Sequence, residues 1–254
     1  MADTTLRVRS TSEIVDASFA LYRRDFLQYV MIGALAYSPL IIVFILLQGM
    51  TSTTGLLVAG ITYLVTIVCL ALVSGMIAKM GSDVYLGGTA DVAATMRAVM
   101  PRVPSLLLAT VLVGVIVMFG LFLLIVPGVY LYTRLFAVPQ MVVLEGLGPM
   151  EAIGRSWALT KGHGGHTFLT LLLVYGIYFV ISIGVTLTTL AMGSVVVQTV
   201  SGMLLGILCY PILTLVALVL YYDLRIRTEG FDVEHMASTL GADPYSGPAG
   251  NLAI

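Results

Sequence analysis

Long apolar runs alternate with short polar connections along most of the chain. Six such runs lie at about 29–47, 56–78, 105–126, 129–144, 167–192 and 195–222. A membrane-spanning helix needs about 20 consecutive, mostly apolar residues. The pattern therefore predicts six transmembrane helices, of which the fourth is short because its residues rise only about 24 Å. Pro127 and Gly128 are expected to break the run between the third and fourth spans.

Three amphipathic segments, 11–26, 90–100 and 150–161, each precede a pair of spans. Ser10 and Glu13 have the spacing of a capping box at the start of the first segment. In the third segment Met150 and Trp157 share an apolar face, which leaves Leu159 on the polar side. This pattern is typical of helices that lie in the membrane interface.

The first and third amphipathic segments also resemble each other in sequence. EIVDASFAL at 13–21 and EAIGRSWAL at 151–159 share Glu, Ser, Ala and Leu at a constant offset. Each copy precedes two spans and enters from the same side, so the repeats would be parallel rather than inverted. The expected fold is an all-α, polytopic bundle of three repeats, each an interfacial helix followed by a transmembrane hairpin.

Composition supports a membrane protein. The chain is 59% hydrophobic and 10% charged, whereas soluble domains carry about 25% charged residues. A net charge of −1 gives no reason to expect a nucleic-acid partner. The expected organisation is one integral membrane domain over 1–235 and a flexible cytoplasmic tail over 236–254.

Basic residues indicate the orientation of this bundle. In the six-span arrangement eleven of the twelve Lys and Arg residues fall on one side, and Arg134 is the exception. The positive-inside rule places that side in the cytoplasm. We therefore expect a multi-pass protein of the cytoplasmic (inner) membrane with both termini in the cytoplasm.

Arg134 is the only charged residue that the pattern places inside the membrane. A charge there costs at least about 2.5 kcal/mol and is a functional candidate by default. One interpretation is a structural arginine whose long side chain reaches the outer headgroups. The other is a clamp on a lipid phosphate or another anion, since the guanidinium matches phosphate geometry. Tyr130 and Tyr132, on the same predicted span, complete this candidate anion-binding site.

The remaining charged residues of interest favour a structural role at the cytoplasmic face. The end of the last span is expected to form a cluster of ion pairs that meets Glu145 or Arg155; its members are Asp223, Arg225, Arg227 and Glu229. Arg155 is also spaced i,i+4 from Glu151, as in a helical ion pair. The cytoplasmic residues around Trp157 and Asp223 are expected to lock the fold. His163 and His166 lack a third ligand nearby in the sequence, so we expect solvated histidines and neither a metal nor a cofactor.

Several of these residues also carry a resemblance. The motifs are Pro127-Gly128-x-Tyr130-Leu131-x-x-Arg134, Ala152-Ile-x-Arg155-Ser156-Trp157-x-Leu159-Thr160-x-Gly162, and the stretch from Tyr221 to Asp232. In these motifs the chain resembles the membrane domain of some bacterial glycerophosphoryl diester phosphodiesterases and related stand-alone bacterial membrane proteins. The resemblance covers residues of about 10–235. It implies that the chain belongs to this group of membrane proteins, but it implies no particular activity. In the fused proteins the diesterase chemistry belongs to a separate soluble barrel.

Catalytic patterns such as a Walker A loop, G-x-S-x-G or H-E-x-x-H are missing from the sequence, so we do not expect an enzyme. The first hypothesis is a scaffold or accessory subunit that contacts membrane lipids and another membrane protein or a second copy of itself. The alternative is a carrier or lipid-handling protein that binds an anionic or phosphate-bearing ligand near Arg134.

Overall fold

The computed structural model describes residues 7–46 and 53–231, and helices are the only regular structure within these two ranges. The expected tail, 236–254, lies outside the described residues. Five helical segments in the described part are long and apolar enough to cross a membrane. The structure therefore agrees with a helical membrane bundle, while the number of crossings and the three repeats stay predictions.

The helices fall into two size classes. The long ones are α2 (Phe26–Leu46), α3 (Thr53–Tyr85), α5 (Val103–Leu123), α9 (Gly164–Ala191) and α10 (Val195–Glu229). The short ones are α1 (Thr11–Arg24), α4 (Val92–Val99), α6 (Ile125–Leu135), α7 (Val138–Gln140) and α8 (Pro149–Leu159), with a 3-10 turn η1 (Met100–Arg102) and a π-helical turn η2 (Met141–Glu145).

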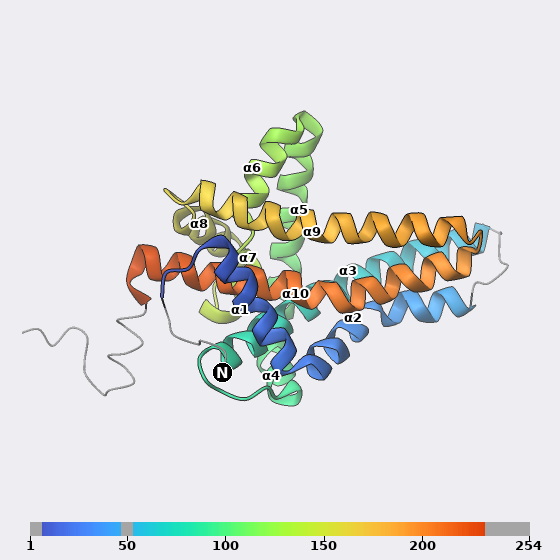
Figure 1. The fold of residues 1–254 in the computed structure, drawn as a ribbon, viewed down its shortest axis with the longest axis horizontal. Coiled ribbons are helices and arrows are strands. Elements are labelled where there is room, and N and C mark those ends of the chain that lie inside the picture. The colour runs from blue at the N-terminus through green and yellow to red at the C-terminus, as the bar shows by residue number, and fades with distance from the viewer. Residues whose placement is uncertain (1–6, 47–52, 232–254) are drawn as a thin grey trace, which may run out of the picture.

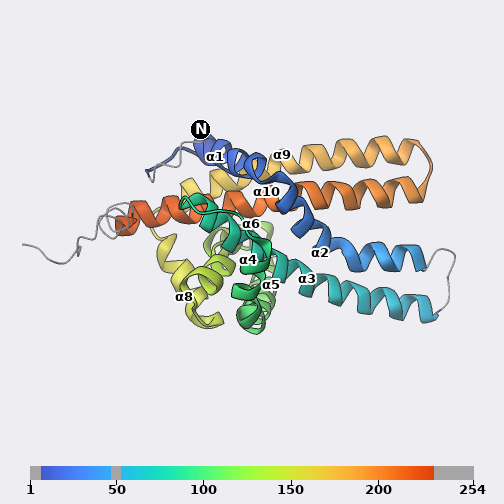
Figure 2. The same ribbon diagram turned by 90° about the horizontal axis from the view of Figure 1, so that it is seen from below.

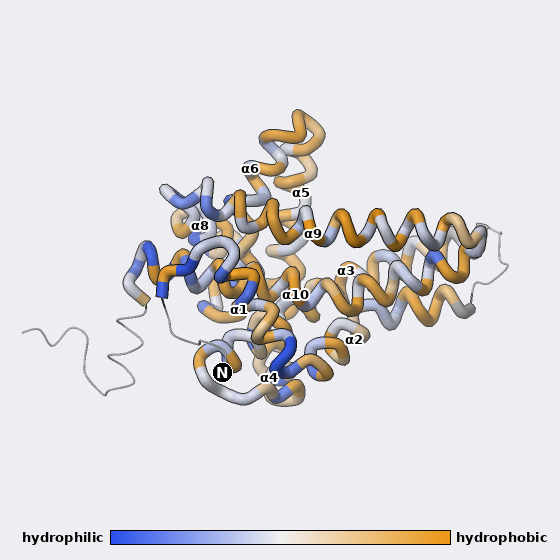
Figure 3. The backbone as a smooth tube through the Cα atoms, in the orientation of Figure 1, coloured by the Kyte–Doolittle hydropathy of each residue, from blue (hydrophilic) through white to orange (hydrophobic). Residues whose placement is uncertain are grey.

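Two long hairpins run side by side and form most of the molecule (Figures 1 and 2). The four helices α2, α3, α9 and α10 extend from a common base in the same direction. The α5–α6 hairpin instead projects sideways from the base, across the direction of the other four helices. The short helices α1, α4 and α8 gather at the base, where Figure 3 shows most of the hydrophilic positions.

Helix α10 is the centre of the bundle. Its C-terminal half is almost completely buried, with Leu215, Leu218 and Tyr221 at 0% exposure. It packs against α9, α2, α1 and α3. Close packing on α2 depends on Gly206, because a Cβ there would lie 2.7 Å from ring carbon Cε1 of Tyr37.

The α5–α6 hairpin turns three residues earlier than the sequence predicted. Leu124 has extended backbone (φ −166°, ψ 153°) and separates the two helices. Pro127 and Gly128 therefore lie inside α6, and the expectation that they break the run is wrong. A proline is tolerated there because the first turn of a helix needs no intrahelical N–H. Gly128 allows the helices to meet, since a Cβ on it would lie 2.7 Å from the backbone nitrogen of Leu121.

The predicted fourth span is not one continuous helix, which corrects the expectation for 129–144. Helix α6 ends at Leu135, and α7 and η2 follow after a turn at Phe136 and Ala137. Pro139 explains the interruption, because it has no N–H to donate to the carbonyl of Leu135 and its ring clashes with that carbonyl. The segment from α6 to η2 thereby leads back to the base of the bundle without forming a long helix.

The first and third amphipathic segments form helices that differ in detail from the expectation. The capping box of Ser10 and Glu13 is present at the start of α1. In α8 the side that contacts the protein is Ala152, Ser156 and Leu159. Leu159, which the sequence pattern placed on the polar side, is therefore buried. Trp157 and Met150 are exposed on the other side, as suits residues that face lipid.

Candidate functional site

Arg134 lies at the end of α6, where its side chain reaches α8. Its Nε donates a hydrogen bond to the Tyr130 hydroxyl (3.1 Å) and its Nη1 to Thr160 Oγ1 (3.3 Å). Ser156 Oγ donates to the main-chain carbonyl of Arg134 (2.8 Å), which attaches the end of α6 to the middle of α8. Residues separated by more than twenty positions thus hold the arginine in place.

Two aromatic rings flank the guanidinium. Its carbon lies 5.3 Å from the ring centroid of Tyr130 and 5.3 Å from that of Trp157. The two rings meet edge to face at 6.0 Å. Such cation–π contacts contribute about 0.5–1 kcal/mol each at exposed sites and more where water is removed. They hold the side chain in one position without neutralising its charge.

No carboxylate within the described ranges pairs with Arg134. Its Nη2 likewise has no hydrogen-bond partner in the described part of the chain. A guanidinium can donate two parallel hydrogen bonds to a carboxylate or a phosphate. Arg134 is therefore a cation that is held in a fixed position and has unused hydrogen-bond donors. An anionic ligand requires this arrangement.

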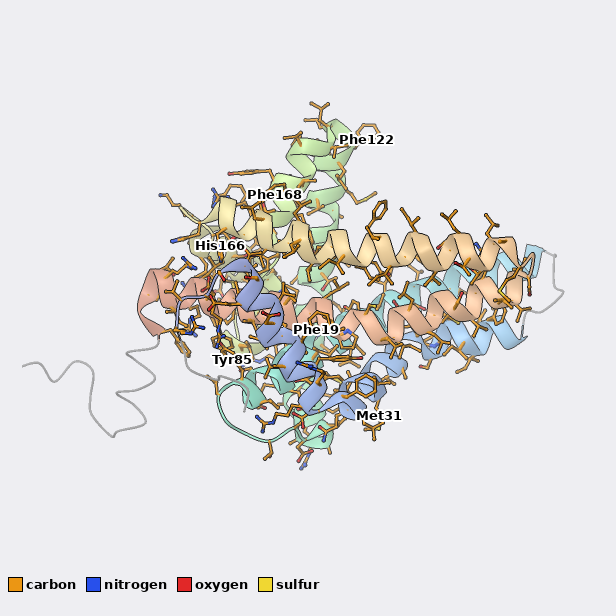
Figure 4. All side chains as sticks on the ribbon, viewed as in Figure 1. Phe19, Met31, Tyr85, Phe122, His166 and Phe168 are labelled. Carbon is orange, nitrogen blue, oxygen red and sulfur yellow. The ribbon has the colours of Figure 1, made fainter. Side chains whose placement is uncertain are left out.

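An apolar groove of about 610 Å³ lies beside this arginine, between α6 and α9. Tyr130 and Thr133 form part of its α6 wall, and Phe168 and Leu172 part of its α9 wall. Gly164 and Gly165 open its end at the start of α9, where an added Cβ would meet nothing within 4 Å. Figure 4 shows Phe168 at this junction, below the tip of the α5–α6 hairpin that Phe122 marks. Tyr130 belongs to both the groove and the Arg134 contacts, so the two features are continuous.

The structure divides the predicted anion-site residues between two places. Tyr130 lies against Arg134, but Tyr132 points to a different cavity, where its hydroxyl hydrogen-bonds that of Tyr175. The expectation that Tyr132 joins the Arg134 site is therefore wrong. The two tyrosines are two positions apart on a helix, a spacing that turns their side chains to different faces.

The sequence placed Arg134 apart from the other basic residues, toward the outer headgroups. The structure instead brings it to the same end of the bundle as Arg155, and the leaflet that this end faces stays a prediction. Arg134 contacts Trp157 and Thr160 at the end of α8, and α8 carries Arg155. Arg134 and Arg155 thus belong to one region at the base of the bundle. The reason is the shortness of α6, which brings Arg134 back to the base instead of carrying it across the bundle.

A second charged cluster joins the turn before α8 to the end of α10. Arg155 Nε donates to Glu145 (3.0 Å), and Arg155 also pairs with Glu229, which pairs with Arg225. Tyr221 donates to the other oxygen of Glu145 (2.7 Å). The expected contact of the α10 end with Arg155 is therefore present through Glu229, whereas Asp223 and Arg227 take no part in this cluster. The i,i+4 pair of Arg155 with Glu151 is not formed, because Glu151 instead accepts from the Gly148 backbone nitrogen.

Charge balance distinguishes this cluster from Arg134. Hydrogen bonding to Glu229 and then to Glu145 raises the pKa of Arg155 above its ordinary value. Each of the two carboxylates has an arginine, and each arginine has a carboxylate. Because every arginine of this network already has a carboxylate, an anionic ligand would find no uncompensated charge there, so its geometry favours a structural role.

Asp223 forms a third polar centre, which ties three parts of the chain together. Its buried side chain accepts from the Arg9 backbone nitrogen (2.7 Å), from Arg227 Nε (2.7 Å) and lies 3.0 Å from His166 Nε2. Arg227 also donates to the Arg9 carbonyl. His166 therefore contacts a carboxylate, which corrects the expectation that it is solvated. The geometry links the start of α1, the start of α9 and the end of α10.

Metal-binding groups are not found in the described ranges, where no three His, Cys, Asp or Glu side chains come together. The residues that sequence reasoning missed are Thr160 and Ser156, which position Arg134 from α8. Their only sequence signal is their place in the motif around Trp157. A pattern of side chains on one helix cannot show that another helix ends beside it.

No family model, no curated protein and no solved structure matches this chain. The resemblance to the phosphodiesterase membrane domain therefore stays a prediction. What the structure supports is an all-helical membrane protein with an unpaired arginine beside an apolar groove.

Proposed function

We propose that this chain is a non-enzymatic protein of the cytoplasmic membrane that binds an anionic phospholipid. The phosphate is held by Arg134, and one acyl chain lies in the groove between α6 and α9. Both termini lie in the cytoplasm, so the bound headgroup belongs to the inner leaflet. Of the two hypotheses that the sequence leaves open, scaffold and lipid-handling protein, the geometry favours the second.

The observation that carries the proposal is the unpaired guanidinium between Tyr130 and Trp157. Because charge in or near a bilayer is expensive unless it is compensated, a partner is needed. None of the described carboxylates provides it. A phosphate supplies both the compensating charge and acceptors for the free Nη2.

The groove identifies the remainder of the ligand as a hydrocarbon chain. Of its lining residues only Tyr130 and Thr133 carry polar side chains, and the Thr133 hydroxyl already donates to the Tyr130 carbonyl (2.7 Å). An apolar channel that starts beside a fixed cation matches an amphiphile with an anionic head. A free inorganic anion would use the arginine but not the groove.

The test measures lipid binding to the purified full chain. Tritiated phosphatidic acid is titrated into protein held in phosphatidylcholine nanodiscs, and the retained lipid is counted. Arg134→Gln is expected to weaken binding about tenfold, the equivalent of one charge-assisted hydrogen-bond pair. The affinity of Arg134→Lys should lie between those of wild type and Arg134→Gln, because lysine keeps the charge but cannot donate two parallel hydrogen bonds to a phosphate. Arg97→Gln, which removes an exposed arginine of α4, is the matched control.

The groove is tested separately with two glycine variants. Gly165→Leu fills the end of the groove, whereas Gly154→Leu adds the same side chain to α8, and neither Cβ meets an atom within 4 Å. Only Gly165→Leu should weaken binding of phosphatidic acid. Competition by inorganic phosphate alone, with no effect of Gly165→Leu, would indicate an anion site without a lipid site. Equal binding by wild type, Arg134→Gln and Gly165→Leu would contradict the proposal.

A further inference from the structure

A second cavity lies inside the protein, away from Arg134 and its groove. It has a volume of about 530 Å³ and is enclosed by α3, α5, α6, α7, α9 and α10. Its rim includes Gly114 and Met118 of α5, and Met118 is 66% exposed. The cavity therefore opens toward the outside beside α5. No part of the proposed phospholipid site uses it.

The walls of this cavity are apolar except for seven side chains, and none of the described residues that line it is charged. An ion that entered it would lose its hydration without gaining a counter-charge, which is strongly unfavourable. The volume lies in the range of cavities that hold small organic ligands. An occupant should therefore be neutral and mostly apolar.

The polar groups of the cavity restrict the occupant further, because most of their hydrogens are already used. The hydroxyls of Thr110 and Thr214 donate to the carbonyls of Leu106 and Tyr210. Each hydroxyl keeps lone pairs that can accept a hydrogen bond. These two positions therefore offer acceptors and no donor.

Two further polar residues, Tyr210 and Gln140, also donate their hydrogens to backbone carbonyls. Tyr210 donates to the Leu70 carbonyl (3.1 Å). In the orientation that satisfies its amide, Gln140 donates to the carbonyls of Ala137 (3.2 Å) and Phe136 (3.3 Å). The Gln140 side-chain oxygen is then left as an acceptor. The hydrogens of both residues are committed to the backbone.

The exception is the pair of phenols formed by Tyr132 and Tyr175. Two hydroxyls that share one hydrogen bond use one hydrogen between them, so the other hydrogen is available to a third group. No acceptor for it occurs among the described residues. The cavity thus offers one phenol donor and several acceptors.

We propose that this cavity binds a lipid alcohol, a neutral molecule with one hydroxyl and an apolar chain. Its hydroxyl oxygen accepts from the Tyr132–Tyr175 pair, and its hydrogen is donated to an acceptor such as Gln140 or Thr214. The chain leaves the cavity past Gly114 and Met118. An ether or a ketone satisfies only the phenol, and a carboxylate brings an uncompensated charge.

Photolabelling of the full chain in detergent micelles tests this site. The probes are a long-chain alcohol with a diazirine on the chain, its methyl ether, and the fatty acid of the same chain. The alcohol should label peptides of α5 and α10 at least fivefold more than the ether or the acid. Equal labelling by alcohol and ether would overturn the proposal, because donation to the cavity would then be irrelevant.

Two sets of variants separate this result from general adsorption. Gly114→Leu fills the cavity without a clash, since its Cβ would meet nothing within 4 Å, and should lower labelling about tenfold. Gly184→Leu, equally unobstructed but on α9 outside the cavity, should have no effect. The double variant Tyr132→Phe with Tyr175→Phe should lose the preference for alcohol, whereas either single variant keeps one free phenol hydrogen and retains it.

The two proposals can fail independently. Arg134→Gln should leave labelling by the alcohol unchanged, and Gly114→Leu should leave phosphatidic acid binding unchanged. If Gly114→Leu fails to fold, the tyrosine variants and the ratio of alcohol to ether labelling still test whether the cavity binds a lipid alcohol. A cavity that accepts all three probes equally in every variant would be a lipid-filled gap without specificity, which contradicts the inference.

Discussion

Helix α1 and helix α8 are built on the same plan. The first turn of each contains a glutamate that accepts from the backbone nitrogen of the N-cap residue, Glu13 from Ser10 and Glu151 from Gly148. The serines at matching positions, Ser18 and Ser156, are both fully buried. Phe19 and Trp157, the residues that follow them, are both about two-fifths exposed. The burial of matched positions supports the predicted repeat.

The difference lies in what each helix holds. Ser18 donates to Ile14 of its own helix, whereas Ser156 donates to Arg134 of α6. Trp157 lies against the Arg134 guanidinium, and no cation lies over Phe19 within the described ranges. The two helices thus share their local structure, while the candidate site arises where α6 ends against α8. Each helix also has its own connection to α10.

The connection of α1 to α10 should be the stronger of the two. Asp223→Asn removes a buried charge that accepts from Arg9 and Arg227, and we expect a loss of about 3 kcal/mol in stability. Thermal unfolding in mild detergent measures this loss. Asp83→Asn, at a partly exposed pair with Lys79 on α3, should cost less than about 1 kcal/mol. Equal losses for the two variants would contradict the central role of Asp223.

The connection of α8 to α10 should be weaker, because its charges are partly exposed to solvent. Arg155→Gln leaves Glu145 and Glu229 without this arginine, with an expected loss of about 1–2 kcal/mol. Hydrogen exchange should show faster opening of α8 and unchanged protection of α1. Parallel loss of protection in both helices would mean that the two connections are not independent.

The matched serines test the comparison within the helices themselves. Ser156→Ala leaves the Arg134 carbonyl without its partner and should cost about 1 kcal/mol. Ser18→Ala removes a bond within a single helix and should cost only a few tenths of a kcal/mol, since such bonds add little to helix stability. The same thermal measurement applies to both. A larger loss of stability for Ser18→Ala than for Ser156→Ala would contradict the expectation that the bond between helices contributes more.

The smallest effect concerns the cap of α1 and depends on pH. Hydrogen bonds from the Ser10 backbone and from Arg7 and Ser10 side chains lower the pKa of Glu13 from 4.5 to about 2. A lowered pKa in the folded state stabilises the protein above pH 4.5, and that contribution is lost as pH falls toward about 2. The protection factor of the first amides of α1, which is the exchange rate of an unstructured chain at the same pH divided by the measured rate, should therefore fall as pH is lowered over this range in wild type. In Glu13→Gln the protection factor should be low and independent of pH.

Local chemistry made much of the fold predictable. The spacing of Ser10 and Glu13 predicted the start of α1, where the capping box is present. Long apolar runs predicted the long helices because their composition suits nothing but a membrane or a core. The contacts of the α10 end with Glu145, through Tyr221, and with Arg155, through Glu229, followed from their expected location at one face.

Other features of the fold depend on contacts between helices, which the sequence pattern does not show. Lipid and protein interior are both apolar, so hydropathy does not show which side of α8 meets the protein, and Leu159 was assigned to the wrong side. Pro127 and Pro139 both lack a backbone N–H, but only Pro139 lies where a continuous helix would need that N–H. The Arg134 site depends on α6 ending beside α8, a contact between segments that no periodicity encodes.

The most direct test of the phospholipid site uses the only tryptophan of the chain, Trp157, which lies against Arg134. Phosphatidic acid and phosphatidylcholine with brominated acyl chains are each added at low mole fraction to vesicles that contain the protein, and quenching of Trp157 fluorescence is measured. We predict that phosphatidic acid quenches several-fold more strongly than phosphatidylcholine in wild type. In Arg134→Gln the two lipids should quench equally. Equal quenching in wild type, or an excess that survives Arg134→Gln, would contradict a lipid phosphate on Arg134.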